Sequence, residues 1–230
     1  MPNNHVPESA HIGRHVVIED DVVLGERVEL GHFCVLLKGT VLGDDVKVGS
    51  HTVLGIQPRG SAFMRQTGQA ADGLRVGDRT RIGSHATIYS GSRIGDDAFV
   101  GDHASIREAV SIGNGTVVGR GAMIELNTSI GDRCTIQTLA YVTGDTVLED
   151  GVFIGPCASM SNDKYMGAKP FELIGPRLLR GAKIGSNATL LPGVVIGQGA
   201  IVGAGSVVTR NTETAELVTG VPAKPRHYVD

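Results

Sequence analysis

The sequence predicts an all-β fold in which short strands coil into a three-sided solenoid of stacked turns. Three observations lead to this prediction: a six-residue repeat runs through most of the 230 residues, glycine recurs at one position of the repeat, and bulky aromatic residues are scarce. A repeat with a fixed period outweighs other local signals in deciding a fold. With five Phe, four Tyr and no Trp, the core must be filled mainly by Val, Ile and Leu, which suits a narrow, regular interior.

The repeat begins at Ile12 and reads IGRHVV, IEDDVV, LGERVE and LGHFCV. Each unit has an aliphatic residue at position one, usually glycine at position two, and a small or β-branched residue at position five. Positions one, three and five of a strand point to the same side, and we expect the glycine to make a corner by adopting backbone angles closed to other residues. Three strands joined by such corners complete an 18-residue coil, and coils stack about 4.8 Å apart as parallel sheets.

The repeat is interrupted twice, in segments that have no hydrophobic period. We expect a single domain over residues 1–230, with coils over about 12–55, 76–161 and 178–213, protruding loops at 56–75 and 162–177, and a C-terminal tail at 214–230. Long loops in a regular scaffold are usually functional.

One of the three corners differs from the other two. If residues eighteen apart share a corner, its position two is occupied by Glu19, Leu37, Gly55, Tyr89, Arg107, Glu125, Thr143, Ser161, Leu179 and Gly197. Glycine is rare in this column, whereas it dominates position two of the other corners. Both loops leave from this odd corner, which makes it the first place to look for function.

Polar side chains gather at the odd corner. We expect one edge of neighbouring coils to carry Glu125, Asn127, Asp145, Ser161, Asn162 and Asp163. Carboxylates about 5 Å apart raise one another's pKa unless a cation lies among them. Such an edge suits an amine or a hydroxyl-rich sugar rather than a polyanion; the alternative is that these are ordinary turn residues.

Histidines form a second column. His15, His51, His85 and His103 all occupy position four of the corner that precedes the odd one. His103 or His85 is a candidate general base, since a neutral imidazole near pH 7 suits that role; the alternative is an exposed turn position that tolerates any polar residue. Within one chain this corner lies roughly 15–20 Å from the acidic edge, so the two could share a site only across a subunit boundary.

Composition excludes several classes of function. The 21 Lys and Arg residues nearly balance the 24 Asp and Glu residues, which argues against a nucleic-acid binder and against a polybasic membrane anchor. No apolar run approaches a membrane span, and the first residues do not resemble a signal peptide. Cys34, Cys134 and Cys157 lack the spacing of metal ligands, so we expect no metal and a cytoplasmic location.

Two stretches carry a resemblance to a known family. LLPGVVIGQGAIVGAGSVVT, followed by GVPAKP at 220–225, is similar to the terminal coils and tail of the left-handed β-helix, hexapeptide-repeat acyltransferase superfamily. EDGVFIGPCASMSNDKYMG at 149–167 resembles its nucleotide-sugar N-acetyltransferase branch. The resemblance implies left-handed coiling, against the usual right-handed crossover rule. It also implies transfer of an acetyl group from acetyl-CoA to an amine or hydroxyl of a small polar acceptor, such as an amino sugar or nucleotide sugar.

The resemblance further implies a homotrimer, with coenzyme A in the groove between adjacent prisms. The residues implied for coenzyme A are Ala182, Ala200, Gly203 and Ala204, which would let the pantetheine arm approach, and Lys224 and Arg226, which would face the phosphates. The polar corner and the second loop together give the residues expected at the acceptor, which are Asn127, Asp145, Asn162, Asp163 and Tyr165, and the columns described above give Glu125, His85 and His103 as catalytic candidates.

Two other functions stay open at this point. A γ-class carbonic anhydrase shares the implied fold but needs three zinc-binding histidines, of which His85 and His103 supply two. A non-catalytic solenoid could serve as a scaffold or binding surface. The two loops and the polar corner argue against a pure scaffold, which needs neither.

Overall fold

The computed structural model of the protein describes residues 4–60, 65 and 72–226, and its strands form three parallel sheets wound around one axis. Sheet A contains β3 (Val23–Leu24), β6 (Val41–Leu42), β9 (Arg75–Val76), β12 (Arg93–Ile94), β15 (Ser111–Ile112), β18 (Ser129–Ile130), β21 (Val147–Leu148), β24 (Arg177–Leu178) and β27 (Val195–Ile196). Sheet B contains β1 (His11–Ile12), β4 (Glu29–Leu30), β7 (Lys47–Val48), β10 (Arg81–Ile82), β13 (Phe99–Val100), β16 (Val117–Val118), β19 (Thr135–Ile136), β22 (Phe153–Ile154), β25 (Lys183–Ile184), β28 (Ile201–Val202), β30 (Leu217–Thr219) and β31 (Lys224–Arg226). Sheet C contains β2 (Val17–Ile18), β5 (Val35–Leu36), β8 (Val53–Ile56), β11 (Thr87–Tyr89), β14 (Ser105–Ile106), β17 (Met123–Ile124), β20 (Tyr141–Val142), β23 (Ser159–Met160), β26 (Thr189–Leu190) and β29 (Val207–Val208).

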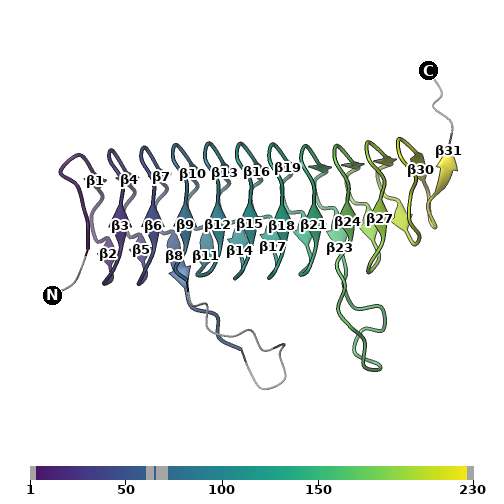
Figure 1. The fold of residues 1–230 in the computed structure, drawn as a ribbon, viewed down its shortest axis with the longest axis horizontal. Helices are drawn as coiled ribbons and strands as arrows, with labels where there is room; N and C mark the ends of the chain where they lie inside the picture. Colours follow the sequence, from purple (N-terminus) through teal and green to yellow (C-terminus); the bar gives the residue numbers. More distant parts are fainter. Residues whose placement is uncertain (1–3, 61–64, 66–71, 227–230) are drawn as a thin grey trace.

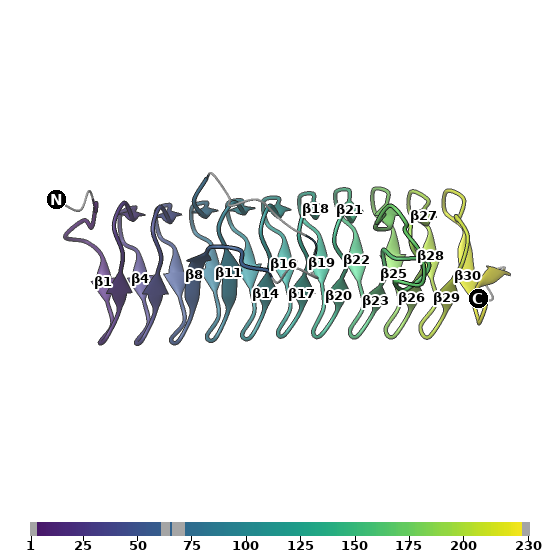
Figure 2. The same cartoon turned by 90° about the horizontal axis from the view of Figure 1, so that it is seen from below.

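The chain visits sheets B, C and A in turn, so that each coil adds one strand to every sheet (Figures 1 and 2). Within uninterrupted coils the register is eighteen residues, as in the pairing of Ser105 with Met123 and of Met123 with Tyr141. The backbone N–H groups of each strand donate to carbonyls of the next coil along the axis. These hydrogen bonds between coils satisfy the backbone groups of the strands. The predicted parallel solenoid is confirmed.

The core is a set of aliphatic ladders along the axis. Ile88, Ile106 and Ile124 occupy position one of successive hexads in sheet C and are fully buried. Position five adds smaller residues, including Cys34 and Cys134, which are also buried. The alternation predicted from the sequence therefore holds, because the last residue of each hexad faces outward and the first residue of the next faces inward.

The corners work differently from the expectation. Position four, not position two, has the left-handed backbone conformation, as at His85 (φ 57°) and Asp97 (φ 55°). Glycine at position two is required by close approach instead: a Cβ on Gly49 would lie 2.5 Å from the backbone nitrogen of Ser84 in the next coil. The stacking distance between coils, rather than backbone angle, explains this glycine column.

At the corner between sheets A and B, the Asp side chains of the turns have a structural role: they bond one coil to the next. Asp78 accepts a hydrogen bond from the backbone N–H of Asp44 (2.9 Å), and Asp96 accepts one from that of Asp78 (2.9 Å). Arg79 donates twice to Asp97 in the next coil, at 2.8 Å each. These Asp residues close the coils on one another, as the turn alternative predicts for this corner.

The second loop changes the phase of the repeat. β23 lies in sheet C and β24, the next strand, lies in sheet A. Leu179 and Gly197 therefore occupy the corner between sheets A and B, and their assignment to the odd corner is wrong, because counting by eighteen ignored the chain extruded in the loop. Leu191 and Thr209, which follow strands of sheet C, take their places and make the odd corner poorer still in glycine.

The C-terminal segment is more ordered than a tail. β30 extends sheet B in parallel with β28, and β31 then pairs antiparallel with β30. The chain reverses between these strands around Gly220 (φ 98°) and a cis peptide bond at Pro222. The expected tail at 214–230 thus closes the end of sheet B over its described residues.

We predict that Ile106→Ala lowers the free energy of unfolding by about 2–5 kcal/mol, because it opens a cavity in the fully buried ladder. Ser105→Ala on the same strand is the control, since its side chain faces outward and the change should stay within about 0.5 kcal/mol. Urea unfolding followed by circular dichroism measures both. Equal losses for the two variants would contradict the inward ladder.

Candidate functional site

Both loops leave the prism at one edge, the corner between sheets C and A, which we call the loop edge (Figure 1). The first loop follows β8 and the second follows β23. Between them, Tyr89, Arg107 and Glu125 occupy position two on three successive coils. Large side chains are the rule at position two of this edge, whereas the other edges mostly hold glycine there.

Arg107 is the centre of a charged cluster at the loop edge. Its Nε and Nη2 donate to the two carboxylate oxygens of Glu108 at 2.8 and 3.0 Å. Its Nη1 lies 3.7 Å from Oε2 of Glu125, and its guanidinium lies 5.0 Å from the centre of the Tyr89 ring. The Glu108 side chain is only 3% exposed, so this pairing is held inside the edge rather than on its surface.

Burial and charge act in opposite directions on Glu125. Burial raises the pKa of its carboxyl group, the positive charge of Arg107 lowers it, and the negative charge of Glu108 raises it further. The net effect is a raised pKa. Burial, followed by the charge of Glu125, also raises the pKa of Tyr141 on the neighbouring coil. A carboxylate with a raised pKa is a better proton acceptor than an ordinary one.

Asp145 joins the loop edge to the first loop. It accepts a hydrogen bond from Asn127 Nδ2 (3.2 Å), and Arg65 of the first loop donates to both of its oxygens at 2.5 and 3.1 Å. Arg65 and Asp145 also line a hollow of about 560 Å³ together with Glu172, Leu173 and Ile174 of the second loop. Residues of both loops and of the edge thus line one open hollow.

The second loop is organised by Asp163. Its two carboxylate oxygens accept hydrogen bonds from the backbone N–H groups of Tyr165 and Gly167, both at 2.8 Å. The Tyr165 ring packs edge-on against Phe171 and beneath Lys169, whose Nζ lies 3.9 Å from the ring centre. Both oxygens of Asp163 are used by the loop itself, so its first role is to shape the loop.

Asn162 anchors the start of that loop. Its side-chain Nδ2 donates to the backbone carbonyl of Gly144 at 3.3 Å. Its backbone carbonyl accepts a hydrogen bond from the backbone N–H of Ile174 at the far end of the loop. The structure therefore brings Glu125, Asn127, Asp145 and Asn162 together on neighbouring coils of one edge.

A further hollow of about 450 Å³ lies at the loop edge where the first loop departs. Its walls include the Tyr89 ring, Lys38, Arg59 and the apolar side chains of Leu37 and Ile56. It adds room for a ligand beyond the Arg107 cluster, along the same edge.

The histidine edge, the corner between sheets B and C, holds the predicted histidine column. The rings of His15, Phe33, His51, His85 and His103 stack in that order with centroids 4.9 Å apart, and His85 and His103 are inclined by only 4°. The ladder includes Phe33, which the sequence argument did not foresee. Sheet C separates His85 and His103 from Glu125, so one chain does not bring these three catalytic candidates together.

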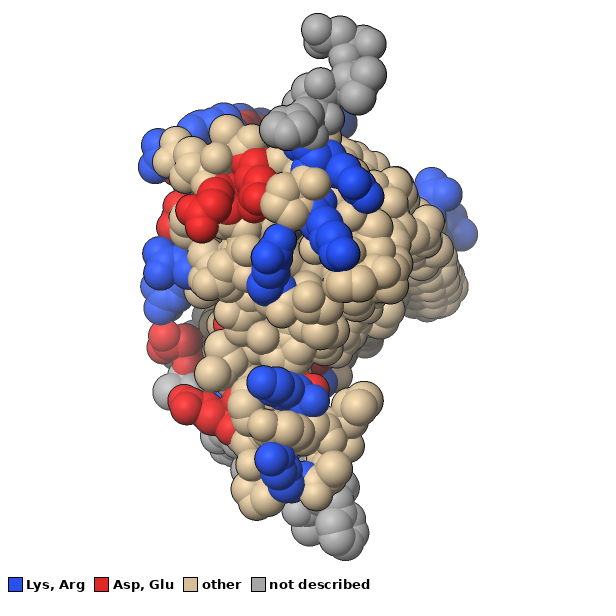
Figure 3. Space-filling view, turned by 90° about the vertical axis from the view of Figure 1, so that its right-hand side faces the viewer, with Lys and Arg blue, Asp and Glu red and all other residues tan. Residues whose placement is uncertain are grey.

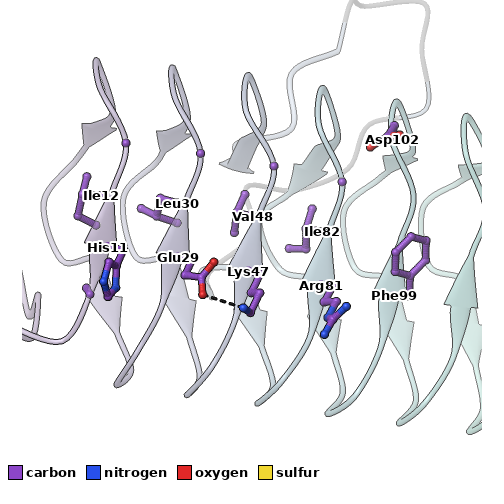
Figure 4. A pocket seen from close by; sticks show the side chains of 15 residues that line it. His11, Ile12, Glu29, Leu30, Lys47, Val48, Arg81, Ile82, Phe99 and Asp102 are labelled. Carbon is purple, nitrogen blue, oxygen red and sulfur yellow. Dashed lines mark hydrogen bonds and ion pairs between the residues drawn. The ribbon is translucent and has the colours of Figure 1, made fainter.

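A groove of about 990 Å³ lies on the outer face of sheet B (Figure 4). His11, Glu29, Lys47, Arg81 and Phe99 stand in a row on this face, and Lys47 donates to Glu29 at 2.7 Å. The groove contains no residue predicted for catalysis or acceptor binding. We therefore assign the candidate site to the loop edge, where the charged cluster and both loops meet.

The coenzyme A positions implied by the resemblance divide into two groups. Ala182 and Ala200 are fully buried, so the prediction that they offer a smooth surface to a ligand is wrong. Both occupy position five of a hexad, which places a side chain in the core.

The other implied positions lie near the C-terminal end, where acidic and basic side chains are both exposed (Figure 3). Gly203 is half-buried against Thr219, and Ala204 is exposed. Lys224 and Arg226 are exposed on β31, and Lys224 pairs with Thr219 in the strand register. Two exposed cations beside small residues fit a ligand that carries phosphates.

Among the described residues, no group of three or more His, Cys, Asp and Glu side chains is placed to hold a metal ion. In that part of the chain no helix has the length and apolar character of a membrane span.

Sequence comparison identifies the repeat. Residues 21–55, 91–125 and 175–210 match the family described as bacterial transferase hexapeptide (six repeats), and residues 73–102 and 109–143 match the hexapeptide repeat of succinyl-transferase. These segments together cover more than half of the chain.

The chain belongs to the hexapeptide-repeat family of bacterial transferases. The expected left-handed parallel β-helix is thereby confirmed as its fold.

Solved structures resemble this hexapeptide-repeat protein. A mutant of GDP-perosamine N-acetyl transferase from Caulobacter crescentus, in complex with CoA and GDP-perosamine, is 29% identical over 62% of this chain and 57% of its own, with a TM-score of 0.47. The acetyltransferase domain of PglB from Neisseria gonorrhoeae, in complex with acetyl coenzyme A, is 26% identical over 54% and 55%, with a TM-score of 0.47. UDP-N-acetylglucosamine acyltransferase from Campylobacter jejuni is 20% identical over 98% and 73%, with a TM-score of 0.48. The matched part is less than two thirds of the length of the first two proteins.

Sequence reasoning missed Arg65, and it gave Arg107 and Glu108 no role in the site. Arg107 stood in the odd column, and a cation beside several carboxylates is the signal that could have marked it. Arg65 lies in a loop without periodicity, eighty residues from Asp145, so no local signal pointed to their pairing.

We predict that Glu125→Gln raises the free energy of unfolding at neutral pH. A carboxyl group whose pKa is raised by folding stabilises the protein below its ordinary pKa of 4.5, and this stabilisation is lost as the pH rises through the folded value. The gain should therefore vanish below about pH 4, where the carboxyl is protonated in both states. Urea unfolding across this range measures it, with Glu149→Gln at another edge as the control; a gain independent of pH would contradict the argument.

We predict that Asp163→Ala loosens the second loop while leaving the solenoid intact. The change removes both acceptors for the backbone N–H groups of Tyr165 and Gly167, so trypsin should cut after Lys164 several-fold faster, while the thermal midpoint changes little. Limited proteolysis followed by mass spectrometry reads out the cut. Glu172→Gln in the same loop serves as the control and should cut at the rate of the unaltered protein.

Proposed function

We propose that the protein transfers an acetyl group from acetyl-CoA to an amine on a small polar acceptor, with an amino sugar or nucleotide sugar as the substrate class. The observation that carries this proposal is the half-buried Glu125, whose pKa is raised, on the edge from which both loops leave. Membership in a transferase family supports it, as do the motifs at 149–167 and 220–225.

The chemistry asks for a proton acceptor beside a bound amine. The amine nitrogen attacks the carbonyl carbon of the thioester, the new C–N bond forms, the C–S bond breaks, and sulfur leaves as thiolate. In the proposal Glu125 accepts the proton that the nitrogen loses and passes it on to the thiolate. Holding amine and thioester in line lowers the barrier by about 7–11 kcal/mol at best.

Polar groups around Glu125 would hold the acceptor. Asn127 and Asp145 present an amide and a carboxylate one coil apart, which suits hydroxyl and ammonium groups of an amino sugar. Arg65 and Arg107 keep this edge from carrying an uncompensated negative charge.

Coenzyme A would be held at the C-terminal end of the prism. In the proposal Lys224 and Arg226 face its phosphates, and its arm runs past Gly203 and Ala204. Coenzyme A supplies the activated acetyl thioester. These residues lie near the histidine edge rather than the loop edge, so we propose a homotrimer in which one copy presents the coenzyme, with His85 or His103, to the loop edge of the next.

We predict that Asn127→Gly reduces kcat/KM for the acceptor about tenfold, the loss of roughly 1.4 kcal/mol from one hydrogen bond to a polar substrate. Glycine is chosen because Asn127 has φ 56°, a conformation that glycine adopts without strain. Thiol release in the presence of acetyl-CoA and a panel of amino sugars measures turnover, and isothermal titration measures binding of acetyl-CoA.

The matched control for this experiment is Asn187→Gly, which removes the same side chain at the same corner conformation (φ 57°) on the histidine edge. It should leave acceptor kinetics unchanged. Equal losses of acceptor turnover and coenzyme affinity in Asn127→Gly would argue against the acceptor role, and no binding of acetyl-CoA at millimolar concentration would remove the proposed function.

A further inference from the structure

Arg107 lies much closer to the carboxylate of Glu108 than to that of Glu125. Glu108 receives two hydrogen bonds from it, at 2.8 and 3.0 Å, whereas the nearest approach to Glu125 is 3.7 Å. A bidentate pair of planar groups is the strongest geometry open to a guanidinium. Arg107 is therefore already committed to Glu108 and meets Glu125 only by longer-range attraction.

The burial of Glu108 explains why this arrangement persists. Its side chain is 3% exposed and Arg107's is 22% exposed, and a buried carboxylate needs a paired, hydrogen-bonded cation. The Glu125 side chain is less buried, at 24% exposed. Water can therefore solvate its carboxylate when Arg107 bonds to Glu108 instead. Loss of the Arg107 pairing would destabilise the more buried Glu108 carboxylate more than the Glu125 carboxylate.

The charged and titratable groups around Glu125 come from the two neighbouring coils. Among the described residues they are Arg107 and Glu108 on one side and Tyr141 on β20 on the other. Arg107 is the cation of this set, so its distribution between the two carboxylates determines how readily Glu125 takes up a proton.

We propose that Glu108 is a positioning residue that withholds Arg107 from Glu125 and thereby keeps Glu125 able to accept a proton. The proposal rests on the acetyl transfer proposed above, because the proton that Glu125 accepts is the one that the amine loses in that reaction. Glu108 itself makes no contact with the reacting atoms in this scheme. If Arg107 paired closely with Glu125, the carboxylate would be a weaker proton acceptor.

The test follows the Glu125 carboxyl carbon by ¹³C NMR in the full-length protein, across a pH titration, with Glu125→Gln to identify its signal. In Glu108→Gln the neighbouring negative charge is lost and Arg107 is released toward Glu125, so the titration midpoint should fall by about one pH unit. In Arg107→Gln the attraction is lost, and the midpoint should rise. Glu108→Asp keeps the charge and should restore most of the original value.

The control is Glu149→Gln, which disrupts an exposed ion pair with Arg177 (3.0 Å) at another edge and should leave the Glu125 midpoint unchanged. An unchanged or higher midpoint in Glu108→Gln overturns the proposal. Should Arg107→Gln fail to fold, as circular dichroism would reveal, Glu108→Gln and Glu108→Asp decide the matter alone.

The titration needs no turnover, so its outcome is independent of the proposed function. Where acetyl transfer is measured, the acid limb of kcat/KM for the acceptor should move to lower pH in Glu108→Gln by the same amount as the NMR midpoint. A midpoint that falls while the protein shows no acetyl transfer would uphold the role of Glu108 and overturn the proposed function. An acid limb that stays in place while the midpoint falls would overturn the part of the proposal that links Glu125 to the proton.

Discussion

The stacking of one coil on the next is the constraint on which the rest of this structure depends. Backbone hydrogen bonds hold adjacent coils in an eighteen-residue register, and the corners approach so closely that a single Cβ at Gly49 would meet the backbone of the next coil at 2.5 Å. Because no coil can slide without breaking this contact along three sheets, every side chain keeps a defined height and direction on the prism.

This register turns repeated sequence positions into ladders with physical consequences. On the histidine edge it stacks four imidazoles and one phenyl ring at 4.9 Å, and between sheets A and B it lets each Asp accept a backbone hydrogen bond from the coil before. On the loop edge it sets Arg107 beside Glu125. The first two ladders are regular and close the coils; the third is irregular, buries a charged pair and lies between two loops, which is why chemistry is assigned there.

Much of the fold was predictable, because a repeat states the same structural rule many times. The prediction failed where the rule was interrupted or where its cause was misread. Leu179 and Gly197 were given the wrong corner because a loop adds residues without adding strands, so counting along the chain loses the phase. Ala182 was assigned to a ligand surface although position five faces the core, and the glycine column follows from close packing rather than from backbone angle.

The sequence by itself determined the three-sided solenoid, the positions of its two interruptions and the edge at which polar residues collect, because these follow from local periodicity. Only the tertiary structure decided which charges pair: that Arg65 reaches Asp145 across eighty residues, and that Arg107 turns to the buried Glu108 in preference to Glu125. Pairing of this kind depends on burial and on the path of a non-repeating loop. The hexapeptide pattern predicts neither of them.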